Sequence, residues 1–403
     1  MNKIRIHRAP KTLITGNGCV SQIGVEAKKL GASKVLILTD PGVACCGTVE
    51  QVERPLREAG LEVGVYDNAV PEPPMSSVEE IVAFTKEGGY DLIVGFGGGS
   101  PIDTAKVVAV LAVTGDKLED YVGVDKVPRK GLPLIAVPTT AGTGSEVTAI
   151  AIFSNEKLNV KQGVVSPHLI PNIALVDPEL TYSCPPHVTA ASGMDALIHC
   201  IEAYISVNAT MHTDPLAAEG IRLISRSIRT AVYDGTNVEA RHNMAMGSLL
   251  GGIAFGNAGV GAVHALSYPI GGMYHVPHGV ANTLMLPWVM EFNMLACLPY
   301  FREIGEFMGE NLEGLSDREA AEKTVQAMRT LAEDLGVPQY LSDVGIPESA
   351  ISDLVEGAMT QGRLWANNPR KFTREDMEQV YRNMAVRPAD KPFKGMKAGA
   401  AGK

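Results

Sequence analysis

The chain has 403 residues, of which 45% are hydrophobic and 20% are charged, and its formal net charge is −10. This length exceeds what one hydrophobic core usually serves, so we expect two domains. The acidic balance argues against a nucleic-acid-binding protein and against docking on anionic membranes, because both favour a basic face.

Strand and helix patterns alternate in the first part of the chain. Short runs rich in Val and Ile predict strands at 34–39, 61–66, 91–96, 132–138 and 173–176. Helical patterns lie before and between these runs, at 20–30, 42–59, 77–87 and 101–113. Such alternation predicts an α/β domain with a parallel, Rossmann-like sheet that helices cover on both faces.

After about Asp177 the β-branched runs disappear and helical patterns take over. They lie at 187–205, 215–233, 238–255, 316–335 and 374–384. We therefore expect an α/β domain over residues 1–182 and an all-α domain over residues 183–403.

The cysteines and the apolar segments indicate in which cellular compartment we expect the protein. Six cysteines are scattered along the chain without a C-x-x-C pair, which is typical of reduced thiols in a cytoplasmic protein. The first residues contain no apolar run long enough for a signal peptide. From His242 to Met290 there is no charged residue, but Asn257, His264 and Pro269 interrupt the apolar sequence. This stretch favours the buried wall of an active site over a membrane span.

A glycine-rich turn joins the third predicted strand to the following helix. Gly97, Gly98 and Gly99 would let a phosphate approach the backbone, and free N–H groups at the helix start would bind it. Ser100 suits the N-cap, Pro101 the first helical position and Asp103 the acid of a capping box. We interpret the turn as a pyrophosphate site, although such a turn can also be only a tight connection.

A second polar loop, PTTAGTGSE at 138–146, follows the next predicted strand. It offers the hydroxyl groups of Thr139, Thr140, Thr143 and Ser145. These could hold a ribose, a phosphate or a nicotinamide amide; the alternative is a simple polar turn.

Four residues of the second half have the chemistry of metal ligands. Asp195 and His199 are spaced i and i+4, so both side chains lie on one face of a helix. His264 and His278 lie in the uncharged stretch. Three imidazoles and one carboxylate suit a divalent transition metal, either Zn²⁺ or Fe²⁺. An Asp–His pair on a helix can also be an ordinary surface or capping pair.

Several segments resemble the iron-containing (group III) alcohol dehydrogenases, and they follow the order of that family over nearly the whole chain. They are GGGSPIDTAK (97–106), PTTAGTGSEVT (138–148), DPEL (177–180), ASGMDALIHCIEAYIS (191–206), GNAGVGAVHALSYPIGG (256–272), PHGVANTLMLPWVMEFN (277–293) and NNPR (367–370).

The resemblance implies an N-terminal dinucleotide-binding domain and a C-terminal helical domain that binds the metal through Asp195, His199, His264 and His278. It implies that Gly97, Gly98, Gly99 and Ser100 bind the pyrophosphate and that the threonines of the second loop line the cofactor. Asp40 resembles the acidic residue near the adenosine ribose, where a carboxylate would repel a 2′-phosphate and so favour NAD over NADP. Lys161 resembles the basic residue near the nicotinamide.

The activity implied is that of an NAD-dependent alcohol dehydrogenase that interconverts a small primary alcohol and its aldehyde. A divalent metal, Fe²⁺ in the first place and Zn²⁺ in the second, would act as Lewis acid. The family also implies a homodimer. One position departs from the pattern, because Tyr268 stands where many members carry a second histidine four residues after the third ligand. Tyr268 and His275 are therefore the candidates for a catalytic role near the substrate.

Other functions remain open from the sequence. One is a hydroxyacid–oxoacid transhydrogenase of the same superfamily, which the SYPI segment at 267–270 resembles. Another is a reductase of sulfonated or phosphonated small aldehydes. A lyase on the same fold would need basic residues near the ligands, which the helical half lacks. The last is a metal-binding protein without activity, and the intact Gly, Asp and His positions argue against it.

Overall fold

The computed structural model describes residues 4–156 and 160–389, and the chain divides into two compact units, Met1–Cys184 and Pro185–Lys403. All strands of the described residues lie in the first unit, and the second unit is built from helices. The α/β fold followed by an all-α fold confirms the predicted fold class.

A six-stranded parallel sheet forms the centre of the first unit, with the strand order β1-β9-β6-β4-β2-β3. A smaller sheet has the order β5-β8-β7, with β7 and β8 antiparallel. The strands are β1 (Thr12–Thr15), β2 (Lys34–Leu38), β3 (Glu62–Tyr66), β4 (Leu92–Gly97), β5 (Gly123–Val124), β6 (Leu134–Pro138), β7 (Ile150–Asn155), β8 (Val160–Val165) and β9 (Ile173–Val176).

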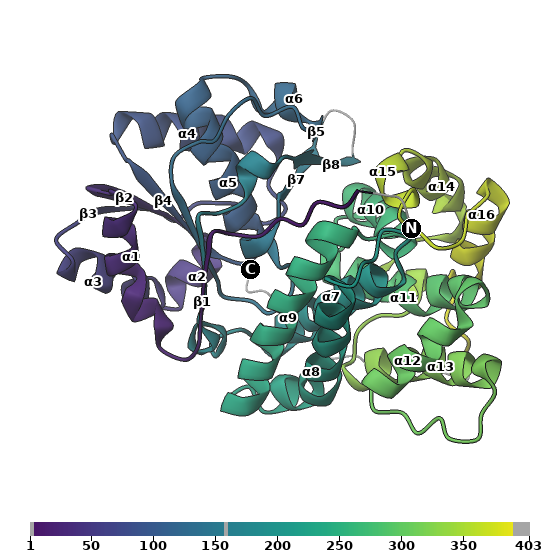
Figure 1. Ribbon diagram of the computed structural model, residues 1–403. Coiled ribbons are helices and arrows are strands. Elements are labelled where there is room, and N and C mark those ends of the chain that lie inside the picture. The colour runs from purple at the N-terminus through teal and green to yellow at the C-terminus, as the bar shows by residue number, and fades with distance from the viewer. Residues whose placement is uncertain (1–3, 157–159, 390–403) are drawn as a thin grey trace. The chain divides into compact units, whose positions relative to one another are not determined.

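Helices cover both faces of the large sheet (Figure 1), as the near-continuous apolar strands β2, β4 and β6 require. On one face α1 and α3 bury Ile23 and Leu56 against Val94, and on the other α4 and α5 bury Ile81 and Val107 against Ile93 and Leu134. The helices of this unit are α1 (Ile23–Lys29), α2 (Pro41–Cys45), α3 (Val49–Glu58), α4 (Val78–Glu87), α5 (Gly99–Thr114) and α6 (Leu118–Tyr121).

The five strands predicted for the large sheet are all present, with bounds that differ by one or two residues at most. The sixth strand, β1, and the small sheet were not predicted. The single helix predicted at 42–59 is wrong, because the chain forms α2 and α3 there with Gly47 between them. Gly47 has a φ of 71°, a left-handed conformation that ends a helix.

In the second unit, three long helices pack closely around Cys200. A Cβ atom on Gly220 or Gly251 would lie 2.5 or 2.7 Å from Cys200 Sγ, so the absence of side chains there lets α7, α8 and α9 approach. The helices are α7 (Pro186–Ile205), α8 (Asp214–Tyr233), α9 (Val238–Ala258), α10 (Ala262–Tyr274), α11 (His278–Asn293), α12 (Leu298–Phe307), α13 (Asp317–Asp334), α14 (Ile351–Met359), α15 (Gly362–Trp365) and α16 (Arg374–Asn383).

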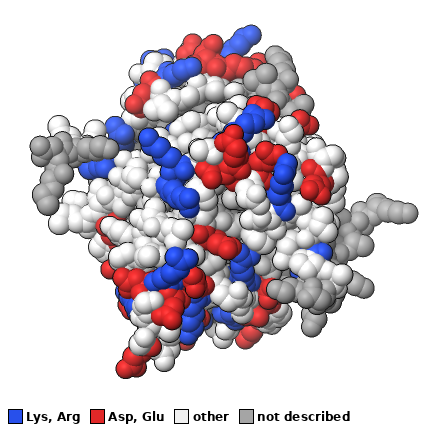
Figure 2. All heavy atoms as spheres, turned by 90° about the vertical axis from the view of Figure 1, so that its right-hand side faces the viewer, with Lys and Arg blue, Asp and Glu red and all other residues white. Residues whose placement is uncertain are grey.

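The uncharged stretch from His242 to Met290 forms most of α9, all of α10 and most of α11. Among the described residues, no single helix has the length and apolarity to span a membrane. Helices α9 and α10 have that length and apolarity only when taken together, and the angle of the bend between them is 102°. On the face that Figure 2 shows, acidic and basic side chains are interspersed.

Candidate active site

Helix α7 carries the first two residues of a cluster of metal-ligand type. The apolar residues of α7 are not confined to one face, because the helix is buried along most of its length. Asp195 and His199 are one turn apart and are only 2% and 4% exposed. Burial of a carboxylate and an imidazole in a helical core is costly unless partners compensate both.

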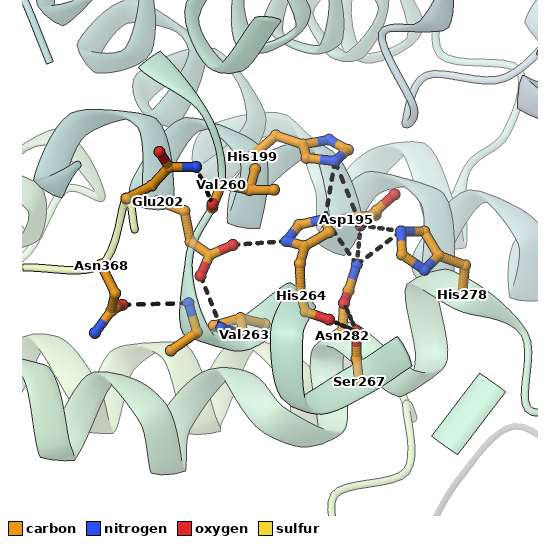
Figure 3. A network of polar contacts seen from close by, with 12 residues as sticks. Asp195, His199, Glu202, Val260, Val263, His264, Ser267, His278, Asn282 and Asn368 are labelled. Atoms are coloured by element: carbon orange, nitrogen blue, oxygen red, sulfur yellow. Dashed lines mark hydrogen bonds and ion pairs between the residues drawn. The ribbon is translucent and has the colours of Figure 1, made fainter. Parts of the chain in front are cut away.

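Two neighbouring helices supply the other members of the cluster. His264 lies in the first turn of α10, and His278 is the first residue of α11. Asp195 Oδ1 lies 3.9 Å from His199 Nε2 and 3.8 Å from both His264 Nε2 and His278 Nε2. One ligand atom from each of the four residues lies within 4.8 Å of the others (Figure 3). The structure thus brings together all four ligands predicted from the sequence.

One imidazole of this cluster, His264, has a carboxylate partner on its outer nitrogen. His264 Nδ1 lies 2.6 Å from Glu202 Oε2, and Glu202 Oε1 accepts a hydrogen bond from Val263 N at 2.8 Å. Because the carboxylate accepts the proton of Nδ1, Nε2 of His264 keeps a free lone pair toward the cluster. His264 Nε2 and His199 Nε2 lie 3.1 Å apart, so both could bind the same cation.

A second hydrogen-bonded group lies below Asp195 in Figure 3. Asn282 Nδ2 donates to Asp195 Oδ1 at 2.6 Å and lies 3.1 and 3.0 Å from Nε2 of His264 and His278. Ser267 donates its hydroxyl proton to Asn282 Oδ1, which fixes the orientation of the amide. Asn282 is fully buried and Ser267 is 1% exposed.

The electrostatics of Asp195 favour its charged form. Burial by itself raises the pKa of Asp195, but His199, His278 and His264, together with the Asn282 amide, outweigh burial and lower it. An ionised carboxylate with three imidazole nitrogens fits a divalent transition metal in donor type and number.

Tyr268 and His275, the residues predicted to act on the substrate, occupy different environments. Tyr268 follows His264 by one turn of α10, and its ring centroid lies 6.4 Å from that of His264 and 5.9 Å from that of His278. It is 7% exposed. His275 is exposed and ends α10 in a left-handed conformation, with a φ of 55°. Of these two residues, Tyr268 is the one that lies against the ligand cluster in the contacts of the described residues.

The glycine-rich turn of the first unit lies where parallel sheets bind nucleotides. In the strand order of the large sheet, β3 lies on one side of β2 and β4 on the other, so the order in which strands are added to the sheet reverses between β2 and β4. Ligands bind at such a switch point, beyond the carboxyl ends of the strands. Asp40 follows β2 there, and Gly97 ends β4. A Cβ atom on Gly97 would lie 3.2 Å from Asp40 Oδ2, so the two loops adjoin.

The start of α5 differs from the sequence interpretation. The helix begins at Gly99 with Gly98 as its N-cap, and no side chain caps it. The assignment of Ser100 to the N-cap and of Asp103 to a capping box is therefore wrong. Because Gly98 is the N-cap and Gly99 the first helical residue, neither residue has a side chain that covers the backbone N–H groups at the helix start. Ser100 Oγ instead accepts a hydrogen bond from Glu72 N at 3.0 Å.

The second polar loop packs directly on the glycine turn. Thr139 N donates to Gly97 O at 2.9 Å, and a Cβ atom on Gly99 would lie 2.7 Å from Thr143 Cγ2. Thr140 is the nearest side chain to Gly98, with its Oγ1 3.7 Å from the position of a Cβ atom. The structure thus places the three threonines of the loop beside the glycines.

Asp103 and Ser145, which the sequence suggested as cofactor contacts, bond to each other and to the protein. The Ser145 hydroxyl donates to Asp103 Oδ1, and Asp103 Oδ2 accepts from Ile152 N at 2.9 Å. Lys106 Nζ donates to Ser145 Oγ at 2.8 Å and to Ile150 O at 2.7 Å. This buried network joins α5 to the second loop and to β7.

Lys161 lies on β8 and is 6% exposed. Its ammonium group pairs with Glu72 Oε1 at 3.1 Å. Since the backbone N–H of Glu72 also binds Ser100, one residue connects Lys161 with the glycine turn.

Glu72, Glu202, Ser267 and Asn282 are site residues that the sequence interpretation missed. Glu202 and Ser267 each stand three residues after a ligand, and Asn282 stands four residues after His278. Helical spacing places these side chains on the face of the neighbouring ligand, and that signal could have found them.

The comparisons with known proteins match both halves of the chain. Residues 10–178 match the family model described as iron-containing alcohol dehydrogenase, and residues 189–385 match that of the Fe-containing alcohol dehydrogenase family, C-terminal.

Similar proteins cover nearly the full chain. Long-chain-alcohol dehydrogenase 1 of Geobacillus thermodenitrificans is 46% identical over 91% of this chain and 93% of its own length. NAD-dependent methanol dehydrogenase of Bacillus methanolicus is 38% identical over 93% of this chain and 98% of its own length. A crystal structure of 1,3-propanediol oxidoreductase, 40% identical, superposes with a TM-score of 0.92 and covers 95% of this chain and 100% of its own.

Proposed function

The chain belongs to the iron-containing alcohol dehydrogenase family, and from this premise we propose that it interconverts a small primary alcohol and its aldehyde. It is an enzyme, an alcohol/aldehyde oxidoreductase that uses NAD and a divalent metal. The observation that carries the proposal is the buried cluster of one carboxylate and three imidazoles, together with the Glu202 carboxylate that sets the tautomer of His264.

Asp195, His199, His264 and His278 would hold the metal, with Fe²⁺ proposed first and Zn²⁺ second. When bound, the cation would supply Lewis-acid polarisation of the substrate oxygen, and the nicotinamide would supply hydride-transfer chemistry. The protein residues would hold these groups in place: Asp195 would supply negative charge, and His264 would remain a neutral donor because Glu202 accepts the proton of its other nitrogen. Tyr268, beside His264 and His278, would shape and hydrogen-bond the substrate.

The first unit would bind NAD at the switch point of its sheet. Gly97, Gly98 and Gly99 would leave the backbone N–H groups at the start of α5 free for the pyrophosphate. Asp40 would bind the adenosine ribose, and Thr139, Thr140 and Thr143 would line the cofactor together with Ser100 and Lys161. Asp103 and Ser145 would act through the loop that they anchor.

The experiment that tests the function is a panel of alcohols and aldehydes with the metal-loaded protein and NAD, read by absorbance of NADH. Ethanol, butanol, small diols and lactaldehyde are the expected substrates, and NADP should serve less well than NAD. Sulfonated and phosphonated aldehydes, and a hydroxyacid–oxoacid pair without free NAD, test the alternatives. Turnover with none of the primary alcohols or their aldehydes would contradict the proposal.

Removal of one ligand tests the metal site. His264→Ala should lose bound metal and NADH formation together, because the loss leaves three donors and removes the partner of Glu202 Oε2. Metal content by elemental analysis and turnover are measured on the same sample. A variant with full activity and normal metal content would show that the cluster is not the site.

We also propose that the protein is cytoplasmic and homodimeric. None of the six cysteines forms a disulfide, which supports a reducing compartment. Sedimentation of the purified chain tests the dimer.

A further inference from the structure

The metal cluster is supported from each helix that contributes to it. In α7, Glu202 follows His199 by three residues; in α10, Ser267 follows His264 by three; in α11, Asn282 follows His278 by four. Each of the three residues bonds to another helix, since Glu202 binds His264, Ser267 binds Asn282, and Asn282 binds Asp195. Figure 3 shows this ring of contacts around the ligands.

Asn282 occupies the central position in this ring. Its amide nitrogen lies 2.6–3.1 Å from ligand atoms of Asp195, His264 and His278, that is, from three of the four. The amide nitrogen carries two protons: it donates one to Asp195 Oδ1 and can donate the other to one of the two imidazole nitrogens, whereas an amide oxygen at this position could donate to none of the three. Ser267 sets this orientation by donating to the amide oxygen.

We propose that Asn282 is a positioning residue for the metal, whose amide, held by Ser267, assembles the ligand cluster before the metal binds. The inference rests on the proposed function, since it requires a metal at this cluster. The N–H group fixes Asp195 Oδ1 toward the imidazoles and compensates its burial. The metal therefore meets a cluster with its donors already aligned, which lowers the entropic cost of binding.

The dissociation constants for Zn²⁺ and Co²⁺, measured by competition with a chromophoric chelator, test the proposal. Asn282→Ala should raise both constants by about 10–100-fold. Ser267→Ala should raise them less, because the amide remains but can rotate. The Co²⁺ absorption bands should shift in Asn282→Ala, and the Tm of its metal-free form should fall because Asp195 loses a donor.

Thr283→Val is the matched control. Thr283 is the next residue of α11, is equally buried, and donates its hydroxyl proton to Gly279 O within the helix. Its metal dissociation constants should stay within about twofold of the parent.

Equal metal affinity of Asn282→Ala and the parent would overturn the proposal, as would an equal loss in Thr283→Val. If the parent itself bound neither metal, the proposed function would fail instead. The two failures are therefore distinguishable in one titration.

Discussion

Among single side chains beside the metal cluster, Tyr268 stands where many members of the family carry a histidine. Its ring lies against two ligands, at 5.9 Å from His278 and 6.4 Å from His264. A phenol is a weaker proton acceptor at neutral pH than the imidazole that many family members carry there. We therefore propose that Tyr268 acts in substrate binding rather than in proton transfer.

Tyr268→Phe should raise KM or change the order of preferred alcohols, with a modest loss in kcat. Tyr268→His should be tolerated and should move preference toward that of other family members. Steady-state kinetics on the alcohol panel checks both. A loss of about a thousandfold in kcat with metal retained would make Tyr268 the acid–base group. Parent-like kinetics of Tyr268→Phe on every substrate would reduce its role to packing.

Glu202 offers a second test at the level of one side chain. In Glu202→Gln the new amide can present its NH₂ group to His264 Nδ1, which would move the ring proton to Nε2 and block that donor. We expect the metal dissociation constant to rise about 10–100-fold. Nitrogen NMR of the imidazoles reports the tautomer directly. Glu303→Gln, which removes the carboxylate that Tyr204 binds on α12, is the control and should leave the tautomer unchanged.

At the level of elements, the residue proposed to bind the adenosine ribose, Asp40, also caps helix α2. Asp40 Oδ1 accepts a hydrogen bond from Val43 N at 3.0 Å and so caps α2. Loss of an N-cap acceptor costs about 0.5–2 kcal/mol. A substitution that removes the whole side chain would therefore mix the effect of charge with that of the cap.

Asp40→Asn separates the two effects, because the amide oxygen can still cap α2 while the negative charge is gone. The ratio of kcat/KM for NADP to that for NAD should rise, since the repulsion of a 2′-phosphate is removed. The Tm should stay near that of the parent. An unchanged ratio in a folded variant would mean that another residue contacts the ribose.

An element could be predicted when its own residues carry the pattern of a helix or a strand. Strands β2, β4 and β6 are buried on both faces, so their apolar runs predicted them. Helices α10 and α11 carry Pro269 and Pro287 in their interiors, which argue against a helix in any local interpretation. Strands β7 and β8 are only half buried and include Asn155 and Lys161.

The same limit applies to the site. The four ligands could be predicted because residue type and spacing suffice to suggest them. Glu202 and Asn282 could not be assigned from type alone, because each acts on a ligand of another helix. Asp103 was placed at a helix start for its spacing, but it bonds to Ser145 across 42 residues, a contact that only the tertiary fold creates.

For the whole molecule, a buried acid in the first unit makes stability depend on pH. Glu146 lies in the second loop, is 2% exposed, and burial raises its pKa from 4.5 to about 7. Between these two pH values the folded protein binds more protons than the unfolded chain. The free energy of unfolding therefore falls as the pH rises from about 4.5 to 7, by on the order of 3 kcal/mol from this group.

Glu146→Gln removes that contribution. Relative to the parent, the variant should gain Tm steadily between about pH 4.5 and 7 and stay ahead above it. Glu58→Gln, at a side chain that is 70% exposed on α3, is the control and should show no such trend. Thermal unfolding of the three proteins across this pH range checks the prediction. A constant Tm difference between Glu146→Gln and the parent would contradict it.

Glu202, Ser267 and Asn282 support the metal ligands at fixed spacings along α7, α10 and α11. These spacings limit which insertions and deletions the gene can tolerate. Each residue of an α-helix turns the chain by about 100°. One codon inserted between His264 and Ser267, or between His278 and Asn282, would rotate the support away from its partner while the ligand stays in place. A substitution in these turns changes one side chain at a time, whereas an insertion or deletion displaces every residue that follows it in the helix. Among natural variants of this protein, we expect insertions and deletions to be excluded from these segments even where their surface residues vary freely.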